Sequence, residues 1–411
     1  MIKIITFLGA NGARNTQYNY QESIYEGGVF AEVLHQFCTY DEMLVCVTDV
    51  AKEKTFPVLE KLGDPRIKAI DIPTGRTTDE MWETFQIITN HISEGDQVIF
   101  DITHGLRSLP FLAFLFAAYL KTAKNVTIQA IYYGAFELGN PAPVVELSEF
   151  VGMLDWIAAT DRFVKVGDGL PLADLLKNAI PSNLEAKNNP AVRPIRDQLR
   201  KAMEAITDIS QALSLTRPLE TLKSTVELED ILQEADLSFE QRAKPFSLVS
   251  DKVIQEYGQF ALRDAMQEDH LARNLWLQFQ MVSWYQKRGQ VVQAMTLARE
   301  WLVSVTAYRL GVKTLLDKNS RFSVESALHN GNAKIQNKKP KSLSSFDEAF
   351  EKLPEFKEVC QLWDKLTEIR NDIAHVGMNE SPASAQSLKN RAEGVLPELE
   401  QVARIFLDSE I

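Results

Sequence analysis

The sequence has few of the residues that mark disulfide-rich or metal-binding proteins. Its 411 residues include only three cysteines, Cys38, Cys46 and Cys360, and no two of them form a Cys-x-x-Cys pair. An odd number without paired spacing argues against a disulfide framework and a cysteine-rich zinc site. The histidines outside the two motifs described below are isolated, so we also expect no metal site. All three cysteines are expected to be small buried hydrophobic residues.

Long apolar runs and an excess of positive charge are missing too. The longest apolar run, near residues 109–120, has about a dozen residues and is too short for a membrane span. The first residues alternate too much for a signal peptide, so we expect a cytoplasmic protein without membrane contact. The net charge of −12 argues against broad, non-specific coating of nucleic acid. A local pocket can still be basic on an acidic protein.

Residues 1–150 alternate between strand and helix signals. The pattern predicts strands at 2–8, 43–48, 66–72, 97–102 and 126–133, and helices at 26–37, 51–62, 78–92 and 106–121. Short strands separated by helices are typical of parallel βαβ units. We therefore predict an α/β, Rossmann-like domain with a parallel-type sheet covered on both faces. Such sheets bind ligands outside the carboxyl ends of their strands.

From about residue 149 the strand signal disappears and helical periodicity takes over. We expect an all-α half of the chain, divided into a helical connector at 151–250 and a second helical domain at 251–411. Residues 332–345 carry Lys334, Lys338, Lys339 and Lys341 and predict a polar, basic loop. That loop either contacts a nucleic-acid backbone or is simply solvated, and the solvated loop is favoured.

The stretch Arg370-Asn371-Asp372-Ile373-Ala374-His375 suggests a chemical function. It places a permanent cation and a proton carrier five positions apart, which is about 1.4 turns of a helix. Attack on a phosphodiester needs a group that moves protons near neutral pH and a guanidinium for the phosphoryl oxygens. Asn371 adds a neutral donor and acceptor. The alternative is a surface arginine and a capping or core histidine near a helix end.

A second group of polar residues follows the predicted strand at 97–102. The sequence of residues 101–107 is Asp-Ile-Thr-His-Gly-Leu-Arg, in which a strand runs into a turn and then a helix. Such a turn presents backbone N–H groups and a helix N-terminus to an anion. We predict that Thr103, His104, Gly105 and Arg107 bind a ligand, with Gly105 allowing close approach to the main chain. The alternative is a turn that only caps the following helix.

The loop after the first strand adds Gly9, Asn11 and Gly12 as candidate ligand-binding residues. It lacks the G-x-G-x-x-G pattern, and no acidic residue ends the second strand in the dinucleotide pattern. A nicotinamide enzyme is therefore a poor interpretation. The polar residues that continue to Tyr18 suit hydrogen bonding to a nucleobase or ribose. If strands one and four are central, their loops meet at the carboxyl edge of the sheet.

Together the two motifs resemble one family, the ribonucleases of type III CRISPR systems that join a CARF sensor domain to a HEPN effector domain. Arg370-Asn371-x-x-x-His375 matches the HEPN motif, and Asp101-x-Thr103-His104-Gly105-x-Arg107 resembles the CARF motif Asp-x-Thr-Gly-Gly-x-Lys. His104 stands where the family often has Gly, and Arg107 where it often has Lys. The order also matches, with the CARF-like domain at 1–150 and the HEPN-like domain at 251–411.

This resemblance implies a function and a mechanism. A cyclic oligoadenylate, expected to be cyclic tetra-adenylate, would bind at the CARF interface of an obligate homodimer and activate cleavage of single-stranded RNA. No metal or other cofactor is implied. The RNA 2′-hydroxyl would attack the adjacent phosphorus to give a 2′,3′-cyclic phosphate. His375 would move protons, Arg370 would stabilise the phosphorane, and Asn371 would position the phosphate.

Two alternatives to this function remain open. One is a non-enzymatic nucleotide sensor whose helical half contacts a regulator or DNA. The other is a CARF domain that also degrades its own ligand, which Thr103 and His104 motivate. The absence of a clear helix-turn-helix segment and the acidic net charge argue against DNA binding.

Overall fold

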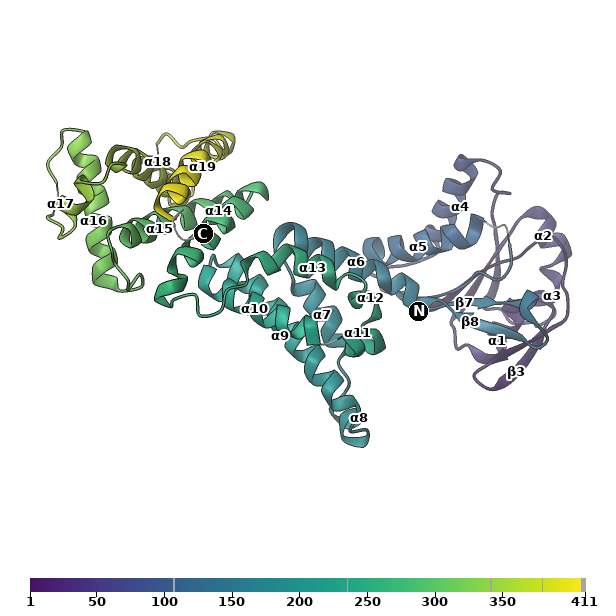
Figure 1. The fold of residues 1–411 in the computed structure, drawn as a ribbon. Coiled ribbons are helices and arrows are strands. Elements are labelled where there is room, and N and C mark those ends of the chain that lie inside the picture. Colours follow the sequence, from purple (N-terminus) through teal and green to yellow (C-terminus); the bar gives the residue numbers. More distant parts are fainter. Residues whose placement is uncertain (106–107, 235, 341, 379, 408–411) are drawn as a thin grey trace. The chain divides into compact units, whose positions relative to one another are not determined.

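The protein consists of an α/β unit followed by an all-helical unit. The computed structural model describes residues 1–105, 108–234, 236–340, 342–378 and 380–407 (Figure 1). The two compact units are Met1–Asp155 and Trp156–Ile411. The predicted succession of an α/β domain and an all-α half is therefore confirmed. A further division of the helical half near residue 250 stays a prediction.

The five predicted strands form one continuous parallel block of the sheet. They are β1 (Ile2–Phe7), β4 (Glu42–Val47), β5 (Ile67–Asp71), β6 (Gln97–Asp101) and β7 (Thr127–Gly134). Their order across the sheet is β5-β4-β1-β6-β7, so β1 is central and lies between β4 and β6. The loops that follow β1 and β6 therefore lie side by side at the carboxyl edge. The winding direction reverses at this point, where doubly wound sheets bind ligands.

Three further strands extend this sheet to eight strands. They are β2 (Thr16–Tyr20), β3 (Ser23–Gly27) and β8 (Ala142–Glu146), and the full order is β3-β2-β8-β7-β6-β1-β4-β5. The prediction of a long loop through Tyr18 and of a helix from residue 26 was wrong here, because β2 and β3 form a hairpin. Helix α1 (Phe30–Phe37) begins only after it. In β2 only Tyr18 is buried, so the strand has no visible hydrophobic alternation.

Helices cover both faces of the sheet, as predicted. One face is covered by α1, α2 (Asp49–Lys54) and α3 (Pro57–Glu60), and the core beneath them includes Ile4. The other face is covered by α4 (Thr78–Asn90) and α5 (Ser108–Lys124), and the core beneath them includes Ile5 (Figure 1). Neighbouring residues of a strand point to opposite faces. The buried residues at five successive positions of β1, after a half-buried Ile2, therefore indicate a strand enclosed on both sides.

The helical unit has one continuous apolar core. Helix α6 (Ser148–Val166) leads into it. The following helices are α7 (Leu170–Ala179), α8 (Asn183–Asn188), α9 (Val192–Ser214), α10 (Pro218–Glu234), α11 (Asp236–Arg242), α12 (Lys244–Ser247), α13 (Ser250–Tyr257), α14 (Leu271–Lys287), α15 (Val291–Arg309), α16 (Lys318–Ile335), α17 (Asp347–Glu351), α18 (Phe356–Ala374) and α19 (Ala385–Leu407). Among the described residues, no helix has the length and apolar character needed to cross a membrane.

The predicted basic loop at 332–345 begins later than expected, because α16 continues to Ile335. Lys334, which was predicted to lie in the loop, belongs to α16 and forms an ion pair with Glu351 at 2.7 Å. Close packing favours the longer helix: a Cβ added to Gly331 would lie 2.7 Å from the Sγ of Cys360 on α18. The absence of a side chain at Gly331 therefore lets α16 and α18 approach closely.

All three cysteines are free thiols. Cys46 and Cys360 are buried, as expected, and Cys38 is half-buried. Burial raises the pKa of each thiol to about 12. The reactive form of cysteine is the thiolate, so these side chains serve as packing groups.

Candidate functional site

Asp101, the last residue of β6, fixes the start of the turn predicted to bind a ligand. Its fully buried carboxylate accepts a hydrogen bond from the Thr6 hydroxyl at 2.6 Å and another from the Thr103 N–H at 2.8 Å. The Thr103 hydroxyl in turn accepts the Gly134 N–H at 2.8 Å. Burial raises the pKa of Asp101, and the charge of His104 opposes that rise. These bonds tie the turn to β1, β6 and β7.

His104 caps helix α1. Its Nε2 accepts the N–H of Phe30, the first residue of α1, at 3.2 Å, and its ring stacks on Phe136 with centroids 5.7 Å apart. Val29 at the N-cap has no side-chain oxygen that could do this. A ring nitrogen that accepts a hydrogen bond carries no proton. Burial lowers the pKa of His104, against the charge of Asp101, which favours this neutral form.

Two glycine-containing turns meet at the carboxyl edge. A Cβ added to Gly9, just after β1, would lie 3.7 Å from the backbone nitrogen of Gly105, just after β6. Gly105 has φ 112° and Gly12 has φ 79°, backbone conformations that favour glycine. The expectation that the loops after the first and fourth parallel strands meet is therefore confirmed. Arg107 lies outside the described residues.

A cavity of about 510 Å³ opens beside these turns. Its lining includes Gly9 and Asn11 after β1, Gly105 after β6, and the starts of the loops after β4 and β5. Gly12, Thr103 and His104 are not among the lining residues. The structure therefore gathers three of the predicted ligand-binding residues at one cavity and gives Thr103 and His104 hydrogen-bond partners within the protein.

The cavity also contains residues that the sequence analysis missed. Thr48 follows β4, and Thr74, Gly75 and Arg76 follow β5. The signal was present, because both loops follow predicted strands of a doubly wound sheet. The backbone N–H of Arg76 donates to Glu80 at 2.9 Å and is the main cause of the lowered pKa of that carboxyl. The charge of Arg76 also lowers the pKa of Glu80, but its guanidinium forms no ion pair with another described residue and can therefore reach an anionic ligand.

The second predicted site lies at the end of α18. This helix buries one face, which includes Leu362, Trp363, Leu366 and Ile369. It ends at His375, whose N–H donates to the Asn371 carbonyl at 3.0 Å. The next two residues, Val376 and Gly377, have φ 49° and 72° and turn the chain away. A β-branched residue is rare in this conformation, so local strain lies directly beside the motif.

The three predicted catalytic residues are all exposed, with Arg370 and Asn371 near the end of α18 and His375 at its C-cap. The Arg370 Nη1 donates to the Asn371 Oδ1 at 3.3 Å. No hydrogen bond joins Arg370 to His375, both of which the structure describes. One chain therefore presents a guanidinium, an amide and an imidazole toward solvent, and among the described residues no side chain pairs with the imidazole.

Asp372, between these residues, was not predicted to matter. Its Oδ2 accepts the N–H of Ala383 at 3.3 Å, and its buried Oδ1 has no hydrogen-bond partner in the described part of the chain. Asp372 therefore links the end of α18 to the segment that leads into α19. An ion pair between Arg391 and Glu368 at 3.0 Å joins the same two helices.

These observations define a class: a doubly wound α/β unit with a ligand-sized cavity, followed by an all-helical unit with an exposed Arg-Asn-x-x-x-His helix end. Residues 152–264 match a family model described as "CRISPR-associated protein MJ1674, second domain". A relative, the CRISPR-associated protein MJ1674 of Methanocaldococcus jannaschii, is 31% identical over 157 residues. The alignment covers 34% of this chain and 24% of the relative. The chain is thus related to a CRISPR-associated protein over part of its length.

Proposed function

We propose that this protein is a single-stranded RNA endoribonuclease of type III CRISPR defence, activated by a cyclic oligoadenylate and independent of metal. The main support is one combination: an exposed Arg370-Asn371-x-x-x-His375 helix end in a chain related to a CRISPR-associated protein. The cavity at the carboxyl edge of the α/β unit adds a place for the activator. The two domains would then be of the CARF and HEPN kinds.

The proposed chemistry needs two groups from α18. His375 would take the proton from the RNA 2′-hydroxyl or return one to the leaving 5′-oxygen, and Arg370 would stabilise the charge on the phosphorane. The 3.3 Å contact with Asn371 holds the guanidinium beside the helix end. Since one imidazole cannot sit on both sides of the phosphorus, a second copy of the helix end supplies the other group. The active enzyme is therefore proposed to be a homodimer.

The size of the first cavity also supports a dimer. A volume of about 510 Å³ suits one drug-sized ligand, which is less than a ring of four adenylates. In a two-fold dimer, two such cavities would face one ring. Asn11 would offer hydrogen bonds to a base, and Arg76 would offer charge to a phosphate.

Helix α5 offers a surface for such a dimer. Phe111, Leu115 and Tyr119 are 68%, 44% and 46% exposed, and their spacing of four places them on one stripe. Trp82 on α4 is 62% exposed. A helix that is apolar all round is normally buried. Leu112, on the same helix, lines the ligand cavity. A second copy of this stripe would cover it and bring the two cavities together.

An RNA cleavage assay tests the proposal. Labelled single-stranded RNA is incubated with the protein, with and without cyclic tetra-adenylate, in the presence of EDTA. The ring should raise cleavage, and His375→Ala should lower the rate by about 10²–10⁴-fold. His270→Ala, a histidine elsewhere in the helical unit, is the control and should cleave normally. Ring binding without RNA cleavage would instead favour the non-enzymatic sensor.

A further inference from the structure

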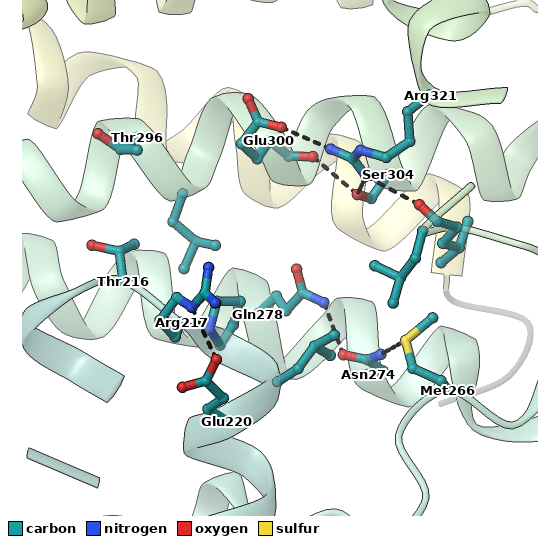
Figure 2. Close-up of a pocket in the computed structure, with 15 residues that line it drawn as sticks. Thr216, Arg217, Glu220, Met266, Asn274, Gln278, Thr296, Glu300, Ser304 and Arg321 are labelled. Atoms are coloured by element: carbon teal, nitrogen blue, oxygen red, sulfur yellow. Dashed lines mark hydrogen bonds and ion pairs between the residues drawn. The ribbon is translucent and has the colours of Figure 1, made fainter. Parts of the chain in front are cut away.

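A second cavity lies within the helical unit and shares no lining residue with either site described above. It has a volume of about 450 Å³. Its walls come from the start of α10, one face of α14, the middle of α15 and the segment before α16 (Figure 2). Neither motif contributes a residue to it. The apolar part of the lining includes Leu219, Leu297 and Leu315.

A chain of amides fixes the polar floor of this cavity. Asn274 is fully buried, and its Nδ2 donates to the Ala265 carbonyl at 2.8 Å. A carbonyl can only accept, so the Asn274 Oδ1 must point the other way. There it accepts the Gln278 Nε2 at 2.8 Å. The orientation of Gln278 follows: its Oε1 points into the cavity, as Figure 2 shows.

The Oε1 of Gln278 is an acceptor that lacks a donor. The side chain is 9% exposed, and no described residue donates a hydrogen bond to this oxygen. This oxygen borders the open cavity, where water can reach it and where a ligand donor could take the place of that water. The amide chain keeps the oxygen in place for a donor that enters the cavity.

Arg217 provides a cation on the same side of the cavity. Its Nε donates to the Glu220 Oε1 at 2.9 Å, and its terminal nitrogens have no hydrogen bond to any described residue. Figure 2 shows the guanidinium pointing into the same space as the Gln278 amide. The other arginine, Arg321, is occupied by Glu300 and Ser304, each at 2.7 Å. Both arginines pair with a glutamate, but Arg321 is bonded through its terminal nitrogens, whereas Arg217 pairs with Glu220 through Nε and can still offer its terminal nitrogens to a ligand.

We propose that this cavity binds one nucleotide, either free or as a residue of an RNA strand. The base lies between the leucine walls, its exocyclic amino group donates to Gln278 Oε1, and its phosphate pairs with Arg217. The volume of about 450 Å³ falls within the range of small-ligand sites. This site is separate from the proposed catalytic helix end and activator cavity, and the proposal stands without them.

Methionine methyl signals in NMR spectra can test this directly. Met266 lines this cavity, whereas Met81 lines the cavity of the α/β unit. The full chain with ¹³C-methyl methionine is titrated with adenosine monophosphate, and signals are assigned with Met266→Leu and Met81→Leu. Adenosine monophosphate should shift Met266. Purine riboside monophosphate, which lacks only the amino group, should bind about tenfold more weakly.

Variants and a second ligand complete the test. Gln278→Leu should abolish the preference for the amino group, while Arg217→Gln should weaken the monophosphate but leave adenosine unchanged. A short 2′-O-methyl oligoadenylate is titrated in the same way. If it binds more tightly than adenosine monophosphate, the natural ligand is a residue of an RNA strand; if adenosine monophosphate binds more tightly, it is a free nucleotide. Equal binding of the two monophosphates, or a Met266 signal that no nucleotide moves, would overturn the proposal and leave a water-filled cavity. If cyclic tetra-adenylate shifts the Met81 signal while no nucleotide shifts the Met266 signal, the nucleotide site proposed here fails and the activator site proposed for the α/β unit stands.

Discussion

At the scale of single residues, the turn after β6 uses its polar side chains to hold the fold. Thr103 bonds to the Gly134 N–H, and His104 bonds to the Phe30 N–H. The turn can therefore present its backbone at Gly105 while Thr103 and His104 keep it rigid. This geometry opposes the interpretation in which Nε2 of His104 acts as a base on a bound ring, because that nitrogen is already an acceptor.

The stability of the protein should depend on pH through His104. Burial lowers the pKa of His104 in the folded protein, so the unfolded chain takes up a proton first as the pH falls. Stability is then fully present above the ordinary histidine pKa of about 6.5 and declines below it. Chemical denaturation at pH values on either side of about 6.5 should show this loss.

The matched variant is His104→Gln, whose amide oxygen can still accept the Phe30 N–H but cannot titrate. Its unfolding free energy should change less with pH than that of the unmodified protein. Asp101 and Glu137 are the charged groups that act on His104 in the unmodified protein, and the variant retains both. The raised pKa of Asp101 makes its own contribution run in the opposite direction. Identical pH profiles for the two proteins would contradict the role given to His104.

The sequence revealed some of these residues better than others. The Arg370 and His375 spacing on a helix could be read directly, since α18 carries a regular apolar face up to Ile369. The partners of Thr103 and His104 could not be read, because Gly134 and Phe30 lie 31 and 74 residues away. Only the strand order brings them together. The proposed roles in ligand binding and catalysis therefore stay predictions.

At the scale of elements, α5 is the helix with the clearest unmet packing. Introducing a charge as Leu115→Glu should dissociate the proposed dimer, because the stripe of Phe111, Leu115 and Tyr119 would have to bury a carboxylate. Sedimentation velocity should show a monomer for this variant. Ile24→Glu, at an isolated exposed residue of β3, should leave the dimer intact. A monomeric unmodified protein, with α5 covered by its own helical unit, would contradict the proposed surface.

The parallel strands and their helices were predictable because each is a separate apolar segment bounded by turn residues. The hairpin of β2 and β3 and the strand β8 were not, for two physical reasons. Residues 16–27 are mostly polar and bury few side chains. Strand β8 contains Pro143, and proline in a short segment argues against a strand unless it lies near a sheet edge.

At the scale of the whole molecule, the proposal requires one activator for two chains. Native mass spectrometry of the protein with cyclic tetra-adenylate should give a complex of two chains and one ring, since a ring with two-fold symmetry matches a two-fold dimer. Arg76→Gln should reduce ring occupancy, whereas Arg217→Gln in the helical unit should not. A complex with one ring on each chain would contradict the shared site.

The match to the family model concerns a region of the chain that the two motifs do not cover. The matched residues 152–264 lie between the two motifs and contain neither of them. Sequence inspection found no pattern in this region, because amphipathic helices without catalytic residues look alike. The match to the family model is therefore an observation on a part of the chain that contains neither motif.

The high pKa of the three thiols has a practical consequence. Since burial raises the pKa of Cys38, Cys46 and Cys360 to about 12, a maleimide applied at neutral pH should react with none of them. A single cysteine introduced at an exposed position, such as Leu343 or Ile24, would then be the sole labelled atom in each chain. Spin or fluorescence labels could be placed without first removing native cysteines, and distances between the two chains of a complex could be followed as an activator is added.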